Sequence, residues 1–170
     1  TQNAMIIFDD GRTSIEFNSS GVEQDIGTYD LLTYRKFPTA SAVFRASIRD
    51  AMYQLKESGD TIFWVLISLY GKIKYVPDIT SVYNRGSNGV VQGTKAIIWV
   101  KTMERWNREM KAIISASALK SSFDYSVFSQ RSLSEYGNLY AGTNWTENPL
   151  VKLKALFQCV KYRFMIRFKR

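Results

Sequence analysis

One carboxylate in this sequence is placed where acid–base chemistry could occur. Asp60 follows Gly59 and opens an apolar run that ends at Tyr70 and predicts a buried helix. The dipole at a helix N-terminus stabilises an ionised carboxylate, and a positioned carboxylate can take a proton from a hydroxyl group. The alternative is a structural role, because Asp is also a common N-cap residue. The two roles are compatible, and Asp60 is therefore a candidate active-site group.

The sequence excludes several other kinds of catalytic site. It contains no histidine, which removes Ser-His-Asp triads, Cys-His pairs and histidine-based zinc sites. The one cysteine, Cys159, lies in an apolar helical pattern that favours a packing role over nucleophilic catalysis. If the protein is an enzyme, its chemistry must come from carboxylates, from hydroxyls or from a segment outside this chain.

The positive charge is concentrated near the C-terminal end. The chain has 170 residues, a formal net charge of +8 and 45% hydrophobic residues, enough for a domain with a core of its own. No acidic residue follows Glu147, whereas seven basic residues do: Lys152, Lys154, Lys161, Arg163, Arg167, Lys169 and Arg170. Because the rest of the chain is close to neutral, we expect no nucleic-acid partner. No apolar run reaches the length that spans a bilayer, so we expect a soluble or peripherally bound protein.

The N-terminal part of the chain predicts strands. Residues 4–8 and 13–17 flank Asp9-Asp10-Gly11-Arg12, which is typical of a hairpin because Asp-Gly supplies the positive φ of a tight turn. A turn is favoured over a metal site at the two aspartates. Residues 39–45, TASAVFR, are small, apolar and β-branched, and they predict a buried strand.

Short helices and turns are expected between these strands. Thr28 should N-cap a short helix that ends before Pro38. Residues 46–56 fit an amphipathic helix, and Gly71 should end the helix that Asp60 begins. Two strands separated by a Pro-Asp turn are predicted next, at residues 72–76 and 79–83.

The C-terminal part predicts helices. A loop with three glycines, residues 86–93, separates it from the strands. Helical patterns follow at residues 94–119 and 123–140, and from Leu150 onward after a cap at Thr146 or Asn148. The predicted fold is therefore α/β in residues 1–93, with an α-helical extension in residues 94–170.

The order of segments in residues 1–93 resembles the C-terminal half of bacterial family-two glycosyltransferases, which have the GT-A fold. Members of that family show a small-residue strand ending in Phe-Arg, as in residues 39–45 here. An acidic residue then precedes a Trp by four positions, as Asp60 precedes Trp64. A Gly-Lys-Ile helix end and a strand closing in Val-Tyr complete the pattern, and they match Gly71-Lys72-Ile73 and Val82-Tyr83.

This resemblance implies an inverting, metal-dependent glycosyltransferase. Such an enzyme moves a sugar from a nucleotide-sugar donor to a saccharide or lipid-linked acceptor in polysaccharide synthesis, in the cytoplasm and on the inner face of the cell membrane. The resemblance assigns the catalytic base to Asp60, acceptor binding to Trp64 and Glu57, and donor-phosphate binding to Arg85. For the last three the alternatives are a core tryptophan, a surface carboxylate and a surface arginine.

The sequence also departs from the family pattern. Asn84 stands where the family usually has an arginine, Arg85 is displaced by one position, and the usual histidine of the following loop is missing. The nucleotide-binding half of the fold, with the Asp-x-Asp that holds Mg²⁺ or Mn²⁺, is not found in these residues. We therefore expect the chain to be the C-terminal part of a longer enzyme, inactive in sugar transfer by itself.

The last predicted helix mixes aromatic and aliphatic residues with the seven cations. This composition predicts attachment of residues 150–170 to an anionic membrane surface, where a lipid-linked acceptor would lie. The alternative is a helix packed on the domain with its cationic face in water. For the whole chain, the alternative function is a non-catalytic α/β interaction module whose basic helix binds a membrane or another protein.

Overall fold

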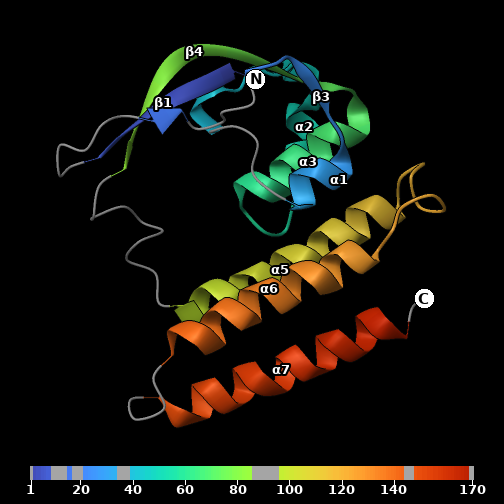
Figure 1. The fold of residues 1–170 in the computed structure, drawn as a ribbon. Helices are drawn as coiled ribbons and strands as arrows, with labels where there is room; N and C mark the ends of the chain where they lie inside the picture. The colour runs from blue at the N-terminus through green and yellow to red at the C-terminus, as the bar shows by residue number, and fades with distance from the viewer. Residues whose placement is uncertain are drawn as a thin grey trace. The chain divides into compact units, whose positions relative to one another are not determined.

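The computed structural model describes residues 2–8, 15–16, 21–33, 39–85, 96–143 and 148–168 (Figure 1). The chain divides into two compact units, Thr1–Gly93 and Thr94–Arg170, at the position where the predicted strands give way to predicted helices. The first unit mixes helices with a small sheet and the second is helical, so the protein is of mixed α and β structure. No helix in the described part of the chain has both the length and the apolar character needed to cross a membrane.

In the described residues of the first unit, four strands form a sheet. Their bounds are β1 Gln2–Phe8, β2 Ile15–Glu16, β3 Gln24–Ile26 and β4 Ile73–Arg85. Their order is β2-β1-β4-β3, with β1 and β4 parallel and the two outer pairs antiparallel (Figure 1). The predicted hairpin is confirmed by the pairing of Met5 with Glu16 and of Ile6 with Ile15. Its turn, with Asp9 and Asp10, lies outside the described residues.

The predicted Pro-Asp turn is wrong, because β4 runs through it as one strand. Pro77 has no N–H to donate to a neighbouring strand, and for this reason the sequence predicts that the strand ends there. The structure places Pro77 where the partners of β4 change: β3 pairs with Ile73–Tyr75, whereas β1 pairs from Val76 onward. The register of β1 against β4 shifts at this point, as in a β-bulge, and the irregularity accommodates the proline.

The predicted buried strand at residues 39–45 is also wrong. Thr39–Ser41 form a short 3-10 helix, and the extended residues after it pair with no strand in the described part of the chain. Val43 is 89% exposed. The sheet order β2-β1-β4-β3 leaves this segment out, so its strand-like composition is not sufficient to make it a strand.

The amphipathic helix predicted at residues 46–56 is shorter than expected. A 3-10 turn, Ala46–Ile48, leads into α2, Arg49–Met52, and neither contains a buried residue. Helix α1, Thr28–Thr33, begins one residue earlier than predicted, because Thr28 is its first helical residue and not its N-cap. The Gly27 N–H donates to Asp30 Oδ2 at 2.9 Å. Thr28 is instead buried, and its Oγ1 lies 2.9 Å from Ser68 Oγ of α3.

The core of the first unit lies around α3, Asp60–Tyr70, as its apolar composition predicts. Ile62 and Val65 of α3 are fully buried, and α1 packs against this helix. Tyr75 of β4 is also fully buried. Gly59 stands at the N-cap position and Gly71 at the C-cap position, so the predicted end of the helix is confirmed.

The described residues of the second unit form three helices, and successive helices run in opposite directions (Figure 1). They are α5 Ala96–Ser115, α6 Ser126–Gly142 and α7 Pro149–Arg167. One apolar cluster joins all three, through Val100 of α5, Tyr136 and Leu139 of α6 and Ala155 of α7. Asn148 stands at the N-cap position of α7, with Pro149 at the first helical position, where its missing N–H costs nothing.

Two tyrosines pack inside this helical unit. The rings of Tyr136 and Tyr162 stack with centroids 6.0 Å apart, and Tyr162 Oη donates to Glu104 Oε1 at 3.4 Å. Burial raises the pKa of both phenols above the ordinary 10.0, and the nearby Glu104 carboxylate adds to the increase. Both phenols therefore stay protonated at a pH where the unfolded chain ionises them.

These raised pKa values predict a loss of stability in alkali. The contribution of these two tyrosines to the free energy of unfolding should be constant with pH below the unfolded-state value of 10.0 and should fall as the pH rises above it. Tyr162→Phe should make this decline shallower, whereas Tyr53→Phe, which changes an exposed tyrosine, should not. Urea unfolding followed by circular dichroism at increasing pH, with tyrosinate absorbance alongside, measures the effect. An equal decline in all three proteins would contradict it.

Candidate functional site

Asp60 lies at the first helical position of α3, directly after the N-cap residue Gly59. Its side chain is exposed, and one carboxylate oxygen, Oδ2, accepts a hydrogen bond of 2.7 Å from Thr39 Oγ1. The sequence alternative of Asp60 as the N-cap residue is therefore wrong. An exposed carboxylate held in one orientation by a hydroxyl donor can accept a proton from a bound ligand.

Thr39 is a residue that the sequence analysis did not assign to the site. It belongs to the 3-10 helix Thr39–Ser41, which is anchored by Ser41, whose hydroxyl donates to the backbone carbonyl of Gln2 in β1. Because Thr39 and Asp60 are 21 positions apart, no local pattern joins them. The only sequence signal was indirect: Thr39 opens the TASAVFR segment that the family resemblance singles out.

Trp64 is 6% exposed, although it stands one helical turn after Asp60. Its ring centroid lies 4.4 Å from that of Phe63 and 6.4 Å from that of Phe44. In this position Trp64 is part of the core of the first unit, so the packing interpretation is the one that its surroundings favour. A sugar ring would need an aromatic face that solvent can reach.

Phe44 provides such a face. It is 42% exposed, and its ring meets that of Phe63 edge to face at a centroid distance of 5.0 Å. Phe63 follows Asp60 by three positions and therefore lies on the same side of α3. The partly exposed ring of Phe44 and the carboxylate of Asp60 therefore lie on neighbouring parts of the surface of the first unit. A carboxylate that binds hydroxyls beside an aromatic ring that covers C–H groups is a combination suited to a carbohydrate.

The other two predicted site residues are placed differently. Glu57 is half-buried in the bend that leads into α3, three residues before Asp60 in the sequence. Arg85 is the last residue of β4 and pairs with Phe8 at the end of β1. The side chain of Arg85 lies outside what the structure describes, and its predicted phosphate contact stays a prediction.

The residues that the structure describes do not supply the ligands of a divalent-metal site. Among the described residues, no group of three or more His, Cys, Asp and Glu side chains could hold a metal ion. Asp9 and Asp10 lie outside the description. Cys159 packs against the apolar cluster of the helical unit, and burial raises the pKa of its thiol, which disfavours the reactive thiolate.

The arrangement thus has one oriented carboxylate, a second carboxylate close by in sequence and a partly exposed aromatic ring. It has the groups for proton transfer from a hydroxylated ligand, and no described group that would hold a metal. Comparisons of this chain with protein-family models, with curated proteins and with solved structures find no match to any of them.

Proposed function

We propose that residues 1–93 form the acceptor side of an inverting glycosyltransferase of the GT-A type. The observation that carries this proposal is Asp60: an exposed carboxylate at the start of a buried helix, oriented by Thr39, at the position where the family pattern has its base. The substrate class is a nucleotide-sugar donor with a saccharide or lipid-linked acceptor. The setting is polysaccharide synthesis at the cytoplasmic face of the membrane.

The chemistry is a single displacement. The acceptor hydroxyl oxygen attacks the anomeric carbon of the donor while Asp60 takes the hydroxyl proton. The new glycosidic C–O bond forms as the bond from the anomeric carbon to the diphosphate oxygen breaks, and the nucleoside diphosphate leaves with that electron pair. Because the nucleophile enters opposite the leaving group, the configuration at the anomeric carbon inverts. Phe44 would cover the apolar face of the acceptor, with Glu57 as a hydroxyl ligand at its edge.

The donor side of the reaction is assigned to parts of the enzyme beyond these residues. A divalent cation bound to the donor diphosphate would stabilise the leaving group. The resemblance places its ligands in the nucleotide-binding half, and the described residues offer no set that fits it. Arg85 stays the candidate from this chain for a donor phosphate.

The proposal predicts the stereochemistry of the product. The full-length protein, incubated with a panel of nucleotide sugars and a lipid-linked saccharide acceptor, should release nucleoside diphosphate only when acceptor is present. The anomeric configuration of the new linkage, measured by NMR, should be opposite to that of the donor. Retention of configuration would contradict the role of Asp60, since a retaining enzyme does not use one base in a single displacement. Absence of transfer across the panel would count against the proposed function itself.

The second candidate is the non-catalytic interaction module. The structure of α7 supports this second candidate, because the helix exposes many large apolar side chains that no described element covers. The exposed apolar side chains of α7 are separate from Asp60. A membrane-bound glycosyltransferase would have both the exposed helix and the catalytic carboxylate.

A further inference from the structure

Helix α7 is apolar on two faces, and only one of them is buried. Val151, Ala155, Cys159 and Tyr162 pack into the helical unit. A second set of apolar side chains is exposed along the whole helix, and we call it the α7 stripe: Leu150, Leu153, Phe157, Val160, Phe164 and Phe168. Its spacings of three and four residues place all members on one side of the helix. Phe157 is 69% exposed and Phe164 61%.

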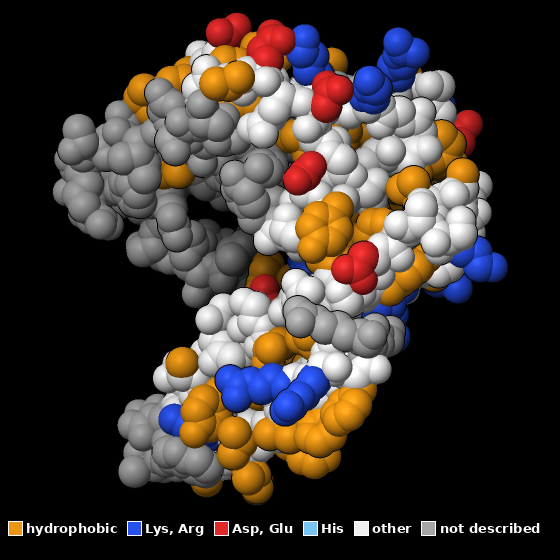
Figure 2. Space-filling model, turned by 45° about the vertical axis from the view of Figure 1, so that its right-hand side comes forward, with side chains coloured by type: hydrophobic (Ala, Val, Ile, Leu, Met, Phe, Trp, Pro, Cys, Tyr) orange, Lys and Arg blue, Asp and Glu red, His pale blue; other side chains and the backbone are white. Residues whose placement is uncertain are grey.

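Cations border the α7 stripe on both sides. At 3.6 residues per turn, Lys154 and Lys161 lie along one edge, and Arg163 and Arg167 along the other. The helix contains no acidic residue. Residues 94–170 contain fourteen Lys and Arg against five Asp and Glu, whereas residues 1–93 contain nine against ten, so the net positive charge belongs to the helical unit. Figure 2 shows basic side chains lying beside exposed hydrophobic ones on this unit.

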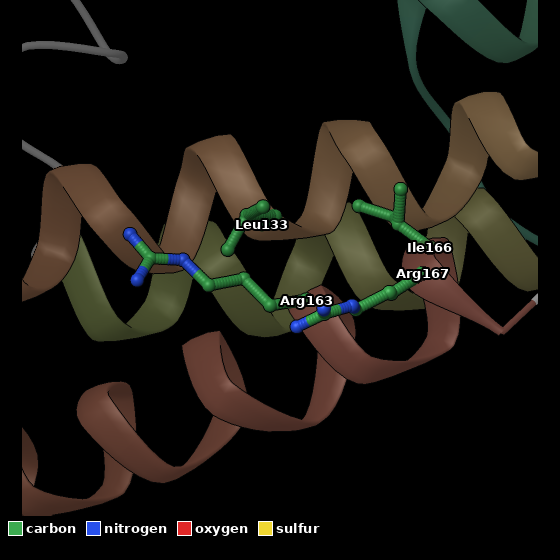
Figure 3. Close-up of a pocket in the computed structure, with 4 residues that line it drawn as sticks. All are labelled: Leu133, Arg163, Ile166 and Arg167. Carbon is green, nitrogen blue, oxygen red and sulfur yellow. The ribbon is translucent and has the colours of Figure 1, made fainter.

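The two arginines also line a pocket. A cavity of about 290 Å³ lies between α6 and α7, bordered by Leu133, Arg163, Ile166 and Arg167. Figure 3 shows both arginine side chains extending in the same direction along the groove between the helices. Neither arginine forms an ion pair with a carboxylate in the described part of the chain. Two guanidinium groups over an apolar floor suit a phosphate that is attached to a hydrocarbon chain.

We propose that α7 docks the protein on an anionic phospholipid surface. The α7 stripe enters the interface between headgroups and acyl chains, and the bordering cations contact the lipid phosphates, with one headgroup seated between Arg163 and Arg167. A helix that lies flat with an apolar stripe between two basic edges has the form of known interfacial helices. Phe157, Phe164 and Phe168 supply the inserted apolar surface, and the charges supply the preference for anionic lipid.

Charge complementarity favours an anionic bilayer over two other partners for α7, a second copy of the helix and a nucleic acid. A second copy of α7 would bring lysines and arginines against one another, with no carboxylate on either helix to pair them. A nucleic acid would present phosphates to the α7 stripe itself, where they would lose water to aromatic and aliphatic side chains. An anionic bilayer offers hydrocarbon opposite the stripe and phosphate opposite its two edges.

Co-sedimentation with vesicles tests the proposal. At low salt the chain should sediment with vesicles containing phosphatidylglycerol, and not with vesicles of phosphatidylcholine alone. The double variant Arg163→Gln/Arg167→Gln should weaken binding by about 30-fold, since each cation near an anionic surface contributes about a fivefold change. The matched variant Lys101→Gln/Arg105→Gln removes the same charge from an exposed face of α5 and should bind almost as well as the parent.

A second pair of variants tests the apolar part. Phe157→Ser should weaken binding at both low and high salt, whereas Ile98→Ser, which changes an exposed side chain of α5, should not. Because all six substituted positions are exposed, circular dichroism should show an unchanged helix content in each of the four variants. Three results would overturn the proposal: no binding to phosphatidylglycerol vesicles, equal losses in the α5 and α7 variants, or sedimentation that depends on protein concentration without vesicles. The residues are separate from Asp60, so failure here leaves the proposed sugar transfer untouched.

Discussion

Replacing Trp64 by alanine is expected to lower the free energy of unfolding by about 3–5 kcal/mol, the usual cost of removing a large buried aromatic side chain. Trp64 is almost fully buried and packs against Phe63 and Phe44. The substitution deletes the indole and leaves a cavity beside the fully buried Ile62 and Val65 side chains of the same helix.

Tyr70→Ala is the matched control for this effect. Tyr70 is also an aromatic residue of α3, but it is 65% exposed at the end of the helix, so its removal leaves no cavity. Urea unfolding of the 170-residue chain, followed by circular dichroism, measures both variants. If Trp64→Ala costs no more than Tyr70→Ala, the tryptophan is not a core residue and its role as an acceptor platform gains support. If the predicted loss is observed, Phe44 becomes the better candidate for that platform.

The parts of the fold that the sequence predicts well are those set by local patterns. The apolar run from Asp60 predicts α3 and its burial, and the two glycines that border it mark its ends. The three helices of the second unit follow from apolar spacing in the same way. The hairpin of β1 and β2 follows from Asp-Gly between two β-rich segments.

The errors concern contacts between distant segments. TASAVFR has the composition of a strand, but whether it becomes one depends on pairing with a distant segment, and the sheet is formed by β2, β1, β4 and β3 without it. Pro77 has the character of a strand breaker, yet β4 changes partners at that residue and continues. Both outcomes depend on sheet order, which hydrophobic periodicity does not encode.

The candidate site likewise contains residues that local sequence patterns identify and contacts between distant segments that they do not. Asp60 is found from sequence because its position at a helix start is a local property. The hydrogen bond from Thr39 and the contact between Phe44 and Phe63 join segments about twenty residues apart, and only the folded chain brings them together. The four-residue spacing places Trp64 on the same face of α3 as Asp60. Whether Trp64 is buried depends on the segments that pack against this part of the helix, which the spacing does not predict.

Asp60→Asn is expected to reduce kcat for sugar transfer by about 10²–10⁴-fold, the usual contribution of a general base. The amide keeps the size of the carboxylate and can still accept the hydrogen bond from Thr39, but it cannot take the proton of the acceptor hydroxyl. The KM for the nucleotide sugar should change little, because the donor is bound by other residues. Asp50→Asn is the control: it neutralises an exposed carboxylate of α2 that pairs only loosely with Arg49, and activity should be unchanged.

The most direct test of the account is therefore the turnover of the full-length protein and its Asp60→Asn variant, at saturating donor and acceptor and with equal helix content by circular dichroism. If Asp60 is the base, the variant should fold, bind the donor and transfer sugar at less than about one hundredth of the parent rate. A folded variant that transfers sugar at the parent rate would contradict the account, because Asp60 would then not be the base.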